Sequence, residues 1–381
     1  MSNWVVAKFG GSSVKDAEAM LRSVKVIESN SDIKIVVISA TQNTTNQLEF
    51  IAQAASKGDE KNLSLLINEL VTRHTKIAED LYSSEEVRKD LNYLYEELRL
   101  ISDEIISIKL CTPKIMDQLY SIGERISSLL MSDLVRLRVP EKNVVLLDAR
   151  NIIKTNSEYQ KAEPQIDIIE EKANELLMPG LSNNTLFVTQ GFIGKDLLGN
   201  TTTLGREGSD YSAALFGEAI DASLVQIWTD VAGIASSDPR KIPEAQFIKT
   251  LSYDEATALA SLGAKVLFPT TLLPTKRKNI PVFVGSSLNP EKGGTLITNS
   301  QDENFKLKAV TLIEKKEFSL ISFIGCHLNL APNLVHELKK EFKEIDVEFI
   351  DMTSVSLSYK VKAEDVAKSL IRAHQILLLQ H

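Results

Sequence analysis

The chain has 381 residues, of which 43% are hydrophobic and 25% charged, a balance that is typical of soluble globular proteins with room for two domains. Its formal net charge is −8 and no basic block stands out, which argues against a nucleic-acid partner. No apolar run approaches the ~20 residues of a membrane span and the N-terminus does not resemble a signal peptide, so we expect a cytoplasmic protein with no membrane partner.

Cysteine and histidine are sparse. The two cysteines, Cys111 and Cys326, are far apart in the sequence, and the five histidines show no ligand spacing. These patterns argue against a disulfide framework, a structural zinc site and any metal site built from protein ligands.

The first 40 residues predict a strand, a helix and a second strand. Residues 3–11 are an apolar run that ends in a glycine pair, residues 13–29 place apolar side chains at helical spacing, and residues 33–40 are again apolar. Because strands joined by a helix are usually parallel, this order predicts a βαβ unit.

The next 250 or so residues continue the alternation of helices and strands. A long helical pattern runs from about residue 46 to 135. Beyond it we expect strands at 143–149, 185–194, 223–229 and 280–287, a polar loop at 195–212, and helices at 212–220 and 253–267. The pattern predicts one large α/β domain over residues 1–298 with a mainly parallel sheet.

The C-terminal tail changes character after a polar linker at 298–306. It predicts a strand, a helix, two strands and a helix, at residues 318–325, 331–342, 347–352, 354–361 and 363–377. This order is typical of a small ferredoxin-like α+β domain, which we assign to residues 305–381.

The first chemical motif is "KFGGSS", which places Lys8, Gly10 and Gly11 at the end of the first predicted strand. It matches neither the Walker A pattern nor GxGxxG. Taken alone, an ordinary glycine turn explains this motif as well as a phosphate-binding turn does.

A stronger motif is "TTTLGREGSDYSAAL", residues 201–215, in which glycines and hydroxyls precede a predicted helix. Free backbone N–H groups and the positive end of a helix favour an anion there. Arg206 could hold a carboxylate through two parallel hydrogen bonds. The alternative is a capped helix with Ser209 or Asp210 as its N-cap, and both interpretations can hold together.

Four further positions carry weight only in combination. Thr229 and Asp230 follow a predicted strand, where ligands gather in open parallel sheets, although an Asx turn explains them equally well. Lys265 follows a Gly-Ala pair, and Glu124 follows a glycine in a helical context. A solvated side chain is the simple explanation for both; the sharper one for Glu124 is a buried carboxylate that accepts from a substrate ammonium.

Together these stretches resemble the aspartate kinases, most closely their monofunctional, lysine-sensitive branch. The ordered set is KFGGSS, VVISATQNTTN, SIGERISS, VTQGFIG, TTTLGREGSDYSAAL, IWTDVAGIASSDPR, GAKVLFPTTLLP and IPVFVGSSLNPEKGGT, between Trp4 and about Ile297. The tail resembles an ACT domain, the small regulatory module of that family. The resemblance implies the amino acid kinase fold, a carbamate kinase-like αβα sandwich. It also implies transfer of the γ-phosphate of ATP to the side-chain carboxylate of L-aspartate, the first step toward lysine, methionine and threonine.

The resemblance further implies roles for individual residues. The catalytic set would be Lys8, Asp210 and Lys265, in which the lysines neutralise phosphate charge and Asp210 orients them. The implied contacts to aspartate come from Ser39, Thr45, Glu124, Arg206 and Ser209. The implied contacts to ATP come from Lys8, Gly10, Gly11, Thr229, Asp230, Ala235, Arg240, Lys265 and Val266. Mg²⁺ is expected to be held mainly by ATP oxygens and water.

The sequence departs from the family pattern in a few places. Asn43 and Glu207 stand where glycine is common, and Ala235 stands where an aromatic residue near the nucleotide is common. The tail has room for about one ACT module, whereas the branch usually carries two, so we hypothesise that feedback inhibition by lysine is weakened, lost or retuned. We expect a homodimer or a higher homo-oligomer with an amino-acid effector at the ACT domain.

Two alternatives stay open from the sequence. One is a kinase of the same fold that acts on glutamate, N-acetylglutamate, a carbamate or UMP, although the Glu124 and Arg206 blocks favour a free amino acid. The other is a non-catalytic amino-acid sensor on a kinase-like scaffold. Retention of Lys8, Arg206, Asp210 and Lys265 counts against the sensor.

Overall fold

The computed structural model describes residues 3–264, 269–300, 305–331, 333–343 and 345–379. The chain divides into two compact units, Met1–Asp230 with Gly285–Glu291, and Val231–Val284 with Lys292–His381. The domains predicted from the sequence, 1–298 and 305–381, stay a prediction. Among the described helices, none is both long enough and apolar enough to cross a membrane.

The elements of the first unit alternate much as the sequence predicts. They are β1 (Val5–Phe9), α1 (Ala17–Glu28), β2 (Ile33–Ile38), α2 (Thr44–Lys57), α3 (Glu60–Asp80), α4 (Glu85–Ile108), α5 (Pro113–Arg138), β3 (Asn143–Leu147), β4 (Lys154–Thr155), α6 (Ile166–Leu176), α7 (Met178–Leu181), β5 (Thr185–Gln190), β6 (Ile193–Asp196), β7 (Thr201–Thr203), α8 (Gly208–Ala219) and β8 (Leu224–Thr229).

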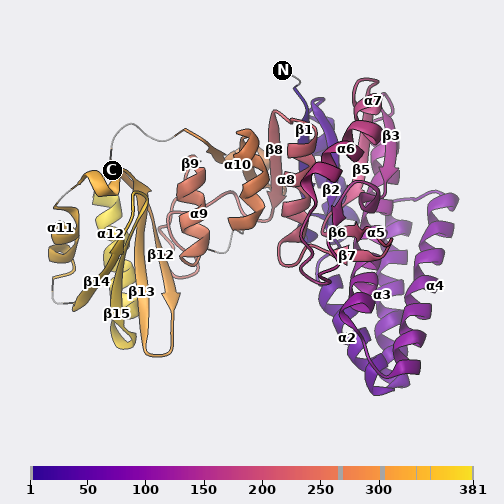
Figure 1. The fold of residues 1–381 in the computed structure, drawn as a ribbon, viewed down its shortest axis with the longest axis horizontal. Coiled ribbons are helices and arrows are strands. Elements are labelled where there is room, and N and C mark those ends of the chain that lie inside the picture. The colour runs from indigo at the N-terminus through magenta and orange to yellow at the C-terminus, as the bar shows by residue number, and fades with distance from the viewer. Residues whose placement is uncertain (1–2, 265–268, 301–304, 332, 344, 380–381) are drawn as a thin grey trace. The chain divides into compact units, whose positions relative to one another are not determined.

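The main sheet of this unit is parallel, with the strand order β3-β5-β2-β1-β8. The connections from β1 through α1 to β2 and from β2 through α5 to β3 step along the sheet in one direction. Those through α6 to β5 and through α8 to β8 step in the other. Because parallel crossovers are right-handed, the two directions put their helices on opposite faces. Accordingly α1 packs against α5. On the other face α6 packs against α8, which completes the predicted αβα sandwich (Figure 1).

The predicted helical region from about residue 46 to 135 is confirmed as four helices, α2 to α5. Their starts follow from local sequence: Ser84 caps α4, and Thr112 caps α5 directly before Pro113, which fits the first helical position. Contacts of α2 with α3 and α4, and of α4 with α5, join them into a bundle (Figure 1). α5 is the longest of the four, and it also packs on β2, β3 and β5, so it links the bundle to the sheet.

The predicted polar loop at 195–212 is wrong, because β6 and β7 form an antiparallel hairpin there and α8 already begins at Gly208. The three threonines of β7 are buried. Their hydroxyls find partners inside the protein: those of Thr202 and Thr155 lie 2.7 Å apart, and that of Thr203 donates to Asp117 at 2.7 Å. Tertiary hydrogen bonds therefore turn a polar stretch into a strand. The short helices α6 and α7 were also not predicted.

The chain continues with β9 (Thr250–Ser252), α9 (Tyr253–Ser261), α10 (Leu273–Lys278), β10 (Val282–Ser286), β11 (Gly294–Thr298), β12 (Lys306–Glu314), β13 (Phe318–Cys326), α11 (Leu334–Glu341), β14 (Val347–Met352), β15 (Ser356–Lys362) and α12 (Val366–Leu379). The predicted helix at 253–267 ends early, at Ser261, and Gly263 has a positive φ of 114° that helices do not adopt. The rest of that prediction reaches residues 265–267, which lie outside the described part of the chain.

The tail of the second unit forms an antiparallel sheet with the order β12-β13-β15-β14. The predicted order of strand, helix, two strands and helix is confirmed. An additional strand, β12, was not predicted, because its charged ends resemble the polar linker before it. The rings of Phe323, Phe342 and Tyr359 meet edge to face in the core of this sheet. Ile242 also reaches that core, so the segment after β8 packs on the tail.

Candidate active site

An open cavity of about 590 Å³ lies at the carboxyl ends of β1 and β2. Ligands collect at this edge of parallel sheets. The lining is drawn from the loop after β2, from α5, and from the turn that leads into α8. Its walls include these residues predicted from the sequence: Lys8, Gly11, Ser39, Thr45, Glu124, Arg206, Ser209 and Asp210.

Lys8 and Asp210 form a buried ion pair in the wall of this cavity. Lys8 lies near the end of β1 and its side chain is 8% exposed, while Asp210 lies in the first turn of α8 and is 5% exposed. Gly11 is the second residue of the glycine pair, and a Cβ on it would lie 2.9 Å from the carbonyl oxygen of Ala40. The chain therefore passes too close to the β2 end for any side chain at that position.

Glu124 lies on α5, is 4% exposed, and accepts a hydrogen bond at 3.4 Å from the backbone N–H of Ala40. Burial raises the pKa of its carboxyl to about 8, even though the hydrogen bond from Ala40 opposes the shift. Among the described residues no cationic side chain forms an ion pair with it. The described part of the chain thus presents a buried carboxyl to the cavity without a counter-charge.

Polar contacts hold α5 in place about one turn beyond Glu124. The Ser127 hydroxyl donates to the carbonyl oxygen of Ser39 at 2.7 Å, next to the cavity. The next residue, Ser128, accepts from Gln190 at the end of β5, and Gln190 in turn accepts from the backbone N–H of Ala149. The two serine contacts join α5 to the ends of β2 and β5, so the helix cannot slide without breaking them.

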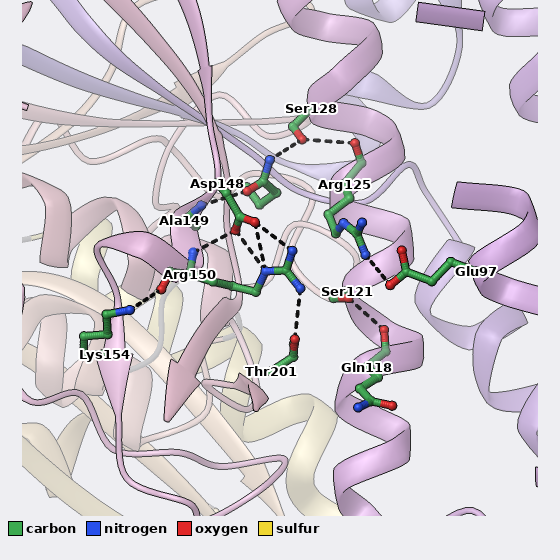
Figure 2. A network of polar contacts seen from close by, with 11 residues as sticks. Glu97, Gln118, Ser121, Arg125, Ser128, Asp148, Ala149, Arg150, Lys154 and Thr201 are labelled. Atoms are coloured by element: carbon green, nitrogen blue, oxygen red, sulfur yellow. Dashed lines mark hydrogen bonds and ion pairs between the residues drawn. The ribbon is translucent and has the colours of Figure 1, made fainter. Parts of the chain in front are cut away.

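Figure 2 shows how this bracing continues along the end of β3. Arg150 forms an ion pair with Asp148 at 2.7 Å and donates to the hydroxyl of Thr201 at 3.0 Å, so it joins the β3 end to β7. On the bundle side, Arg125 pairs with Glu97 of α4 at 2.6 Å. These charges are all partnered within the protein, which marks the network as structural support.

The turn that carries Arg206 has two residues in left-handed conformations, Gly205 with φ 78° and Glu207 with φ 55°. Helix α8 begins at Gly208, so the N-cap position belongs to Glu207, and the predicted caps Ser209 and Asp210 are wrong. Glu207 makes no capping hydrogen bond. Asp210 lies inside the first turn of α8, where it forms the ion pair with Lys8.

Replacing Glu207 with glycine is expected to raise the stability of the protein by about 1 kcal/mol, because glycine adopts left-handed backbone without the steric cost that other residues carry. Differential scanning calorimetry at fixed protein concentration measures the change. Glu207→Ala is the matched control, since it also removes the charge but keeps the unfavourable backbone. An alanine variant as stable as the glycine variant would show that charge, and not backbone conformation, sets the effect.

The predicted nucleotide residues are only partly brought together. The parallel pairing of β1 with β8 places Thr229 and Asp230 beside Gly10, whose N–H donates to the carbonyl oxygen of Trp228 at 3.0 Å. Ala235 and Arg240 lie in the second unit, where Arg240 pairs with Asp238 at 2.8 Å. Lys265 and Val266 lie outside the described residues.

Sequence reasoning missed several residues that line the cavity or hold its lining in place. Tyr120 lines it from α5, donates to Glu49 at 2.7 Å, and meets the ring of Phe192 edge to face. One turn earlier, buried Asp117 accepts from the N–H groups of Gln160 and Thr203, at 2.9 and 3.0 Å to one of its oxygens. The helical spacing of Asp117, Tyr120 and Glu124 puts them on one face of α5, which is the signal that the sequence offered.

Comparison with known proteins adds an independent finding. Residues 3–286 match the amino acid kinase family. The lysine-sensitive aspartokinase 3 of Escherichia coli (strain K12) is 40% identical over 312 residues, which cover 82% of this chain and 68% of that protein. Two solved structures of E. coli aspartokinase III are also similar. One, in complex with aspartate and ADP (R-state), has a TM-score of 0.87 at 29% identity and covers 98% of this chain and 100% of that chain. The other, in complex with lysine and aspartate (T-state), has a TM-score of 0.85 at 30% identity and covers 99% and 100%.

The match over residues 3–286 agrees with the αβα sandwich and its cavity. The chain belongs to the amino acid kinase family. Within that family the extent of its similarity to the E. coli protein makes it an aspartokinase.

Proposed function

We propose that this chain phosphorylates the side-chain carboxylate of L-aspartate, with ATP as the phosphoryl donor. The observation that carries the proposal is Glu124, a buried carboxyl that faces the cavity without a cationic partner among the described residues. Arg206 and Lys8 line the same cavity. A buried carboxyl is costly unless a cation joins it, and the ammonium group of an amino acid is such a cation.

Aspartate has one ammonium and two carboxylates, and the cavity offers a complementary set of charges. Glu124 suits the ammonium, and Arg206 suits the α-carboxylate through two parallel hydrogen bonds. Ser39, Thr45 and Ser209 add hydroxyls to the lining. An N-acetylated acid, a carbamate or UMP has no ammonium to bring to Glu124, so the cavity favours a free amino acid over these substrates.

The chemistry needs positioning and charge neutralisation more than proton transfer. A side-chain carboxylate is already ionised at neutral pH, so no strong general base is required. One carboxylate oxygen attacks the γ-phosphorus, the bond from that phosphorus to the β–γ bridging oxygen breaks, and ADP leaves. Lys8 neutralises charge on the transferring group, and Asp210 fixes the Lys8 ammonium. By the family resemblance, Lys265 adds a second positive charge.

The remaining proposed contacts concern the nucleotide and its metal. Gly10, Gly11, Thr229 and Asp230 lie at the ends of β1 and β8, where the phosphates and ribose of ATP would bind; Ala235, Arg240 and Val266 are proposed by resemblance. Over the described parts of the chain, no group of three or more His, Cys, Asp or Glu side chains is arranged to hold a metal ion. Mg²⁺ that arrives with ATP fits this lining, because such ions keep phosphate oxygens and water as most of their ligands.

We also propose that residues 305–381 form an ACT-like regulatory domain, that an amino-acid effector binds there, and that the chain acts as a homo-oligomer in the cytoplasm. The antiparallel sheet with α11 and α12 supports the domain, and the related E. coli enzyme was solved with lysine bound. Titration of lysine in a kinase assay tests the hypothesis of weakened inhibition. Inhibition at micromolar lysine would contradict it.

The activity is tested by incubating the purified chain with MgATP, hydroxylamine and each candidate acid, and by measuring the acyl hydroxamate. We expect product with aspartate. Product with glutamate alone would establish a different kinase of the same fold, and no product with any acid would favour a non-catalytic sensor.

Replacing Arg206 with lysine is expected to raise the KM for aspartate by roughly tenfold or more with a smaller effect on kcat, because a point charge cannot reproduce two parallel hydrogen bonds to a carboxylate. Steady-state kinetics in the hydroxamate assay measures both constants. Arg99→Lys serves as the comparison, because that side chain is partly exposed on α4 and pairs with Glu96 outside this cavity. An unchanged aspartate KM in the Arg206 variant would remove this residue from the substrate site.

A further inference from the structure

The loop between β2 and α2 forms one wall of the cavity with residues 39–43 and Thr45. It contains Asn43, whose φ of 65° is a left-handed conformation that residues other than glycine rarely adopt. The backbone N–H of Gln42 donates to the carbonyl oxygen of Gly11 at 3.1 Å, so the loop also touches the glycine turn. A segment with unfavourable backbone keeps its shape only when its surroundings fix it.

Two adjacent residues of α3, Arg73 and His74, provide that fixation. The His74 ring is fully buried, with its Nε2 2.9 Å from the hydroxyl of Thr41. Its Nδ1 lies 2.8 Å from the carbonyl oxygen of Leu70. Because a carbonyl oxygen only accepts, Nδ1 carries the proton, and Nε2 is left to accept from Thr41.

This assignment sets the direction of every hydrogen bond in the group. The Thr41 hydroxyl donates to His74, so it accepts from the hydroxyl of Thr44 at 2.6 Å. The Thr44 hydroxyl in turn accepts from the Arg73 guanidinium at 2.8 Å. Each hydroxyl therefore donates once and accepts once, and the chain runs without a break from Arg73 through the loop to His74.

Arg73 adds two further contacts to the same region. Its guanidinium donates to the carbonyl oxygen of Gln42 at 3.2 Å and to the side-chain oxygen of Gln47 at 3.0 Å. Burial, reinforced by the charge of Arg73, lowers the pKa of His74 to about 4, although its contact with Leu70 opposes the shift. A neutral ring at physiological pH is what the acceptor role of Nε2 requires.

We propose that Arg73 and His74 are positioning residues for the amino-acid substrate: they hold the loop after β2 so that Ser39 and Thr45 face the bound acid. The inference rests on the proposed aspartate kinase function. Both residues lie on α3 in the helical bundle, and neither lines the cavity. The proposal therefore gives the bundle an indirect role in the reaction. The hydrogen bonds of Arg73 and His74 do not include the glycine turn at Gly10 and Gly11. Binding of ATP should therefore depend on these two residues much less than binding of aspartate.

The test compares His74→Leu, which removes the acceptor but keeps much of the volume, with His74→Gln, whose side-chain oxygen can accept from Thr41. We expect the leucine variant to raise the KM for aspartate roughly tenfold or more, because it leaves a buried hydroxyl unpaired, with the KM for ATP changed less than about twofold. The glutamine variant should recover most of the loss. Lys76→Ala, an exposed position on the same helix, is the control and should match the wild type.

Thr41→Val provides a second arm. Combined with His74→Leu, it should cause little more loss than either single change, because both variants break the same hydrogen bond. Additive losses, equal rises in both KM values, or no recovery with glutamine would overturn the proposal.

Hydrogen–deuterium exchange of peptides from residues 39–47 separates this inference from the proposed function. Faster exchange in the leucine variant, restored by glutamine, is expected whether or not substrate is present. If the wild-type chain forms no aspartyl hydroxamate, the proposed function fails, and unchanged exchange in the leucine variant then overturns the positioning role as well. Changed exchange would retain the positioning role for whichever acid the cavity binds.

Discussion

Replacing Lys8 with methionine is expected to reduce kcat by roughly 1,000-fold or more, because the ammonium that we propose to stabilise charge on the transferring phosphoryl group is lost. The same change should lower the free energy of unfolding by about 3 kcal/mol, since it leaves the buried carboxylate of Asp210 without its partner. Steady-state kinetics and urea unfolding measure the two effects.

The double variant Lys8→Met with Asp210→Asn separates catalysis from folding. It removes the uncompensated charge, so stability should largely return while activity stays lost. A Lys8→Met enzyme that retains more than a tenth of wild-type kcat would show that Lys8 does not act on the phosphoryl group. If the double variant regained activity along with stability, the loss in the single variant would have come from misfolding.

Much of the first unit could be predicted from the sequence because its signals are local. The run at Val5–Phe9 is buried throughout, and the helical pattern of the bundle is sustained over many turns. β7 could not be predicted this way. Its threonines are typical of a loop by composition, and only their partners on β4 and α5, far away in the sequence, make them a strand.

The residues of the candidate site also divide into those that a local motif identifies and those that only the fold identifies. Lys8, Arg206 and Glu124 lie near glycines in motifs that resemble those of the aspartate kinases, so they could be identified from the sequence. Asp117 and His74 lie in ordinary helical sequence, and their importance comes from what they hold: Gln160 and Thr203 in one case, Thr41 in the other. A positioning residue has no motif of its own, because its chemistry depends on a partner that only the fold supplies.

Residues with left-handed backbone are intermediate between those that a motif identifies and those that only the fold identifies. Asn43 and Glu207 stand where the family pattern commonly has glycine, and both have a positive φ in the structure. Asparagine tolerates this conformation better than glutamate does. The family pattern therefore carried information on backbone geometry that composition and periodicity did not.

The second large effect is expected for Glu124→Gln, which should weaken aspartate binding roughly 100-fold while making the protein more stable. The loss follows because glutamine presents a neutral oxygen to the substrate ammonium. The gain follows from the pKa of about 8. A carboxyl whose pKa is raised on folding contributes stability at low pH, and that contribution is lost as the pH rises from its unfolded value, near 4.5, through 8. The wild type should thus be less stable at pH 7 by about 3 kcal/mol than it would be with a neutral side chain.

Two measurements check the Glu124 prediction independently of each other. In unfolding experiments, the free energy of unfolding of the glutamine variant should rise relative to that of the wild type as the pH goes from 5 to 9. A constant difference between the two free energies over that range would contradict the raised pKa. Calorimetry of aspartate binding to the wild type at pH 7, in buffers of different ionisation enthalpy, should show release of about 0.9 proton, because a carboxyl with a pKa of about 8 is mostly protonated until the ammonium arrives. The glutamine variant should release none. On this proposal, proton release and the instability at high pH have one cause: the carboxyl is buried, and within the described residues no cation joins it before the substrate ammonium does.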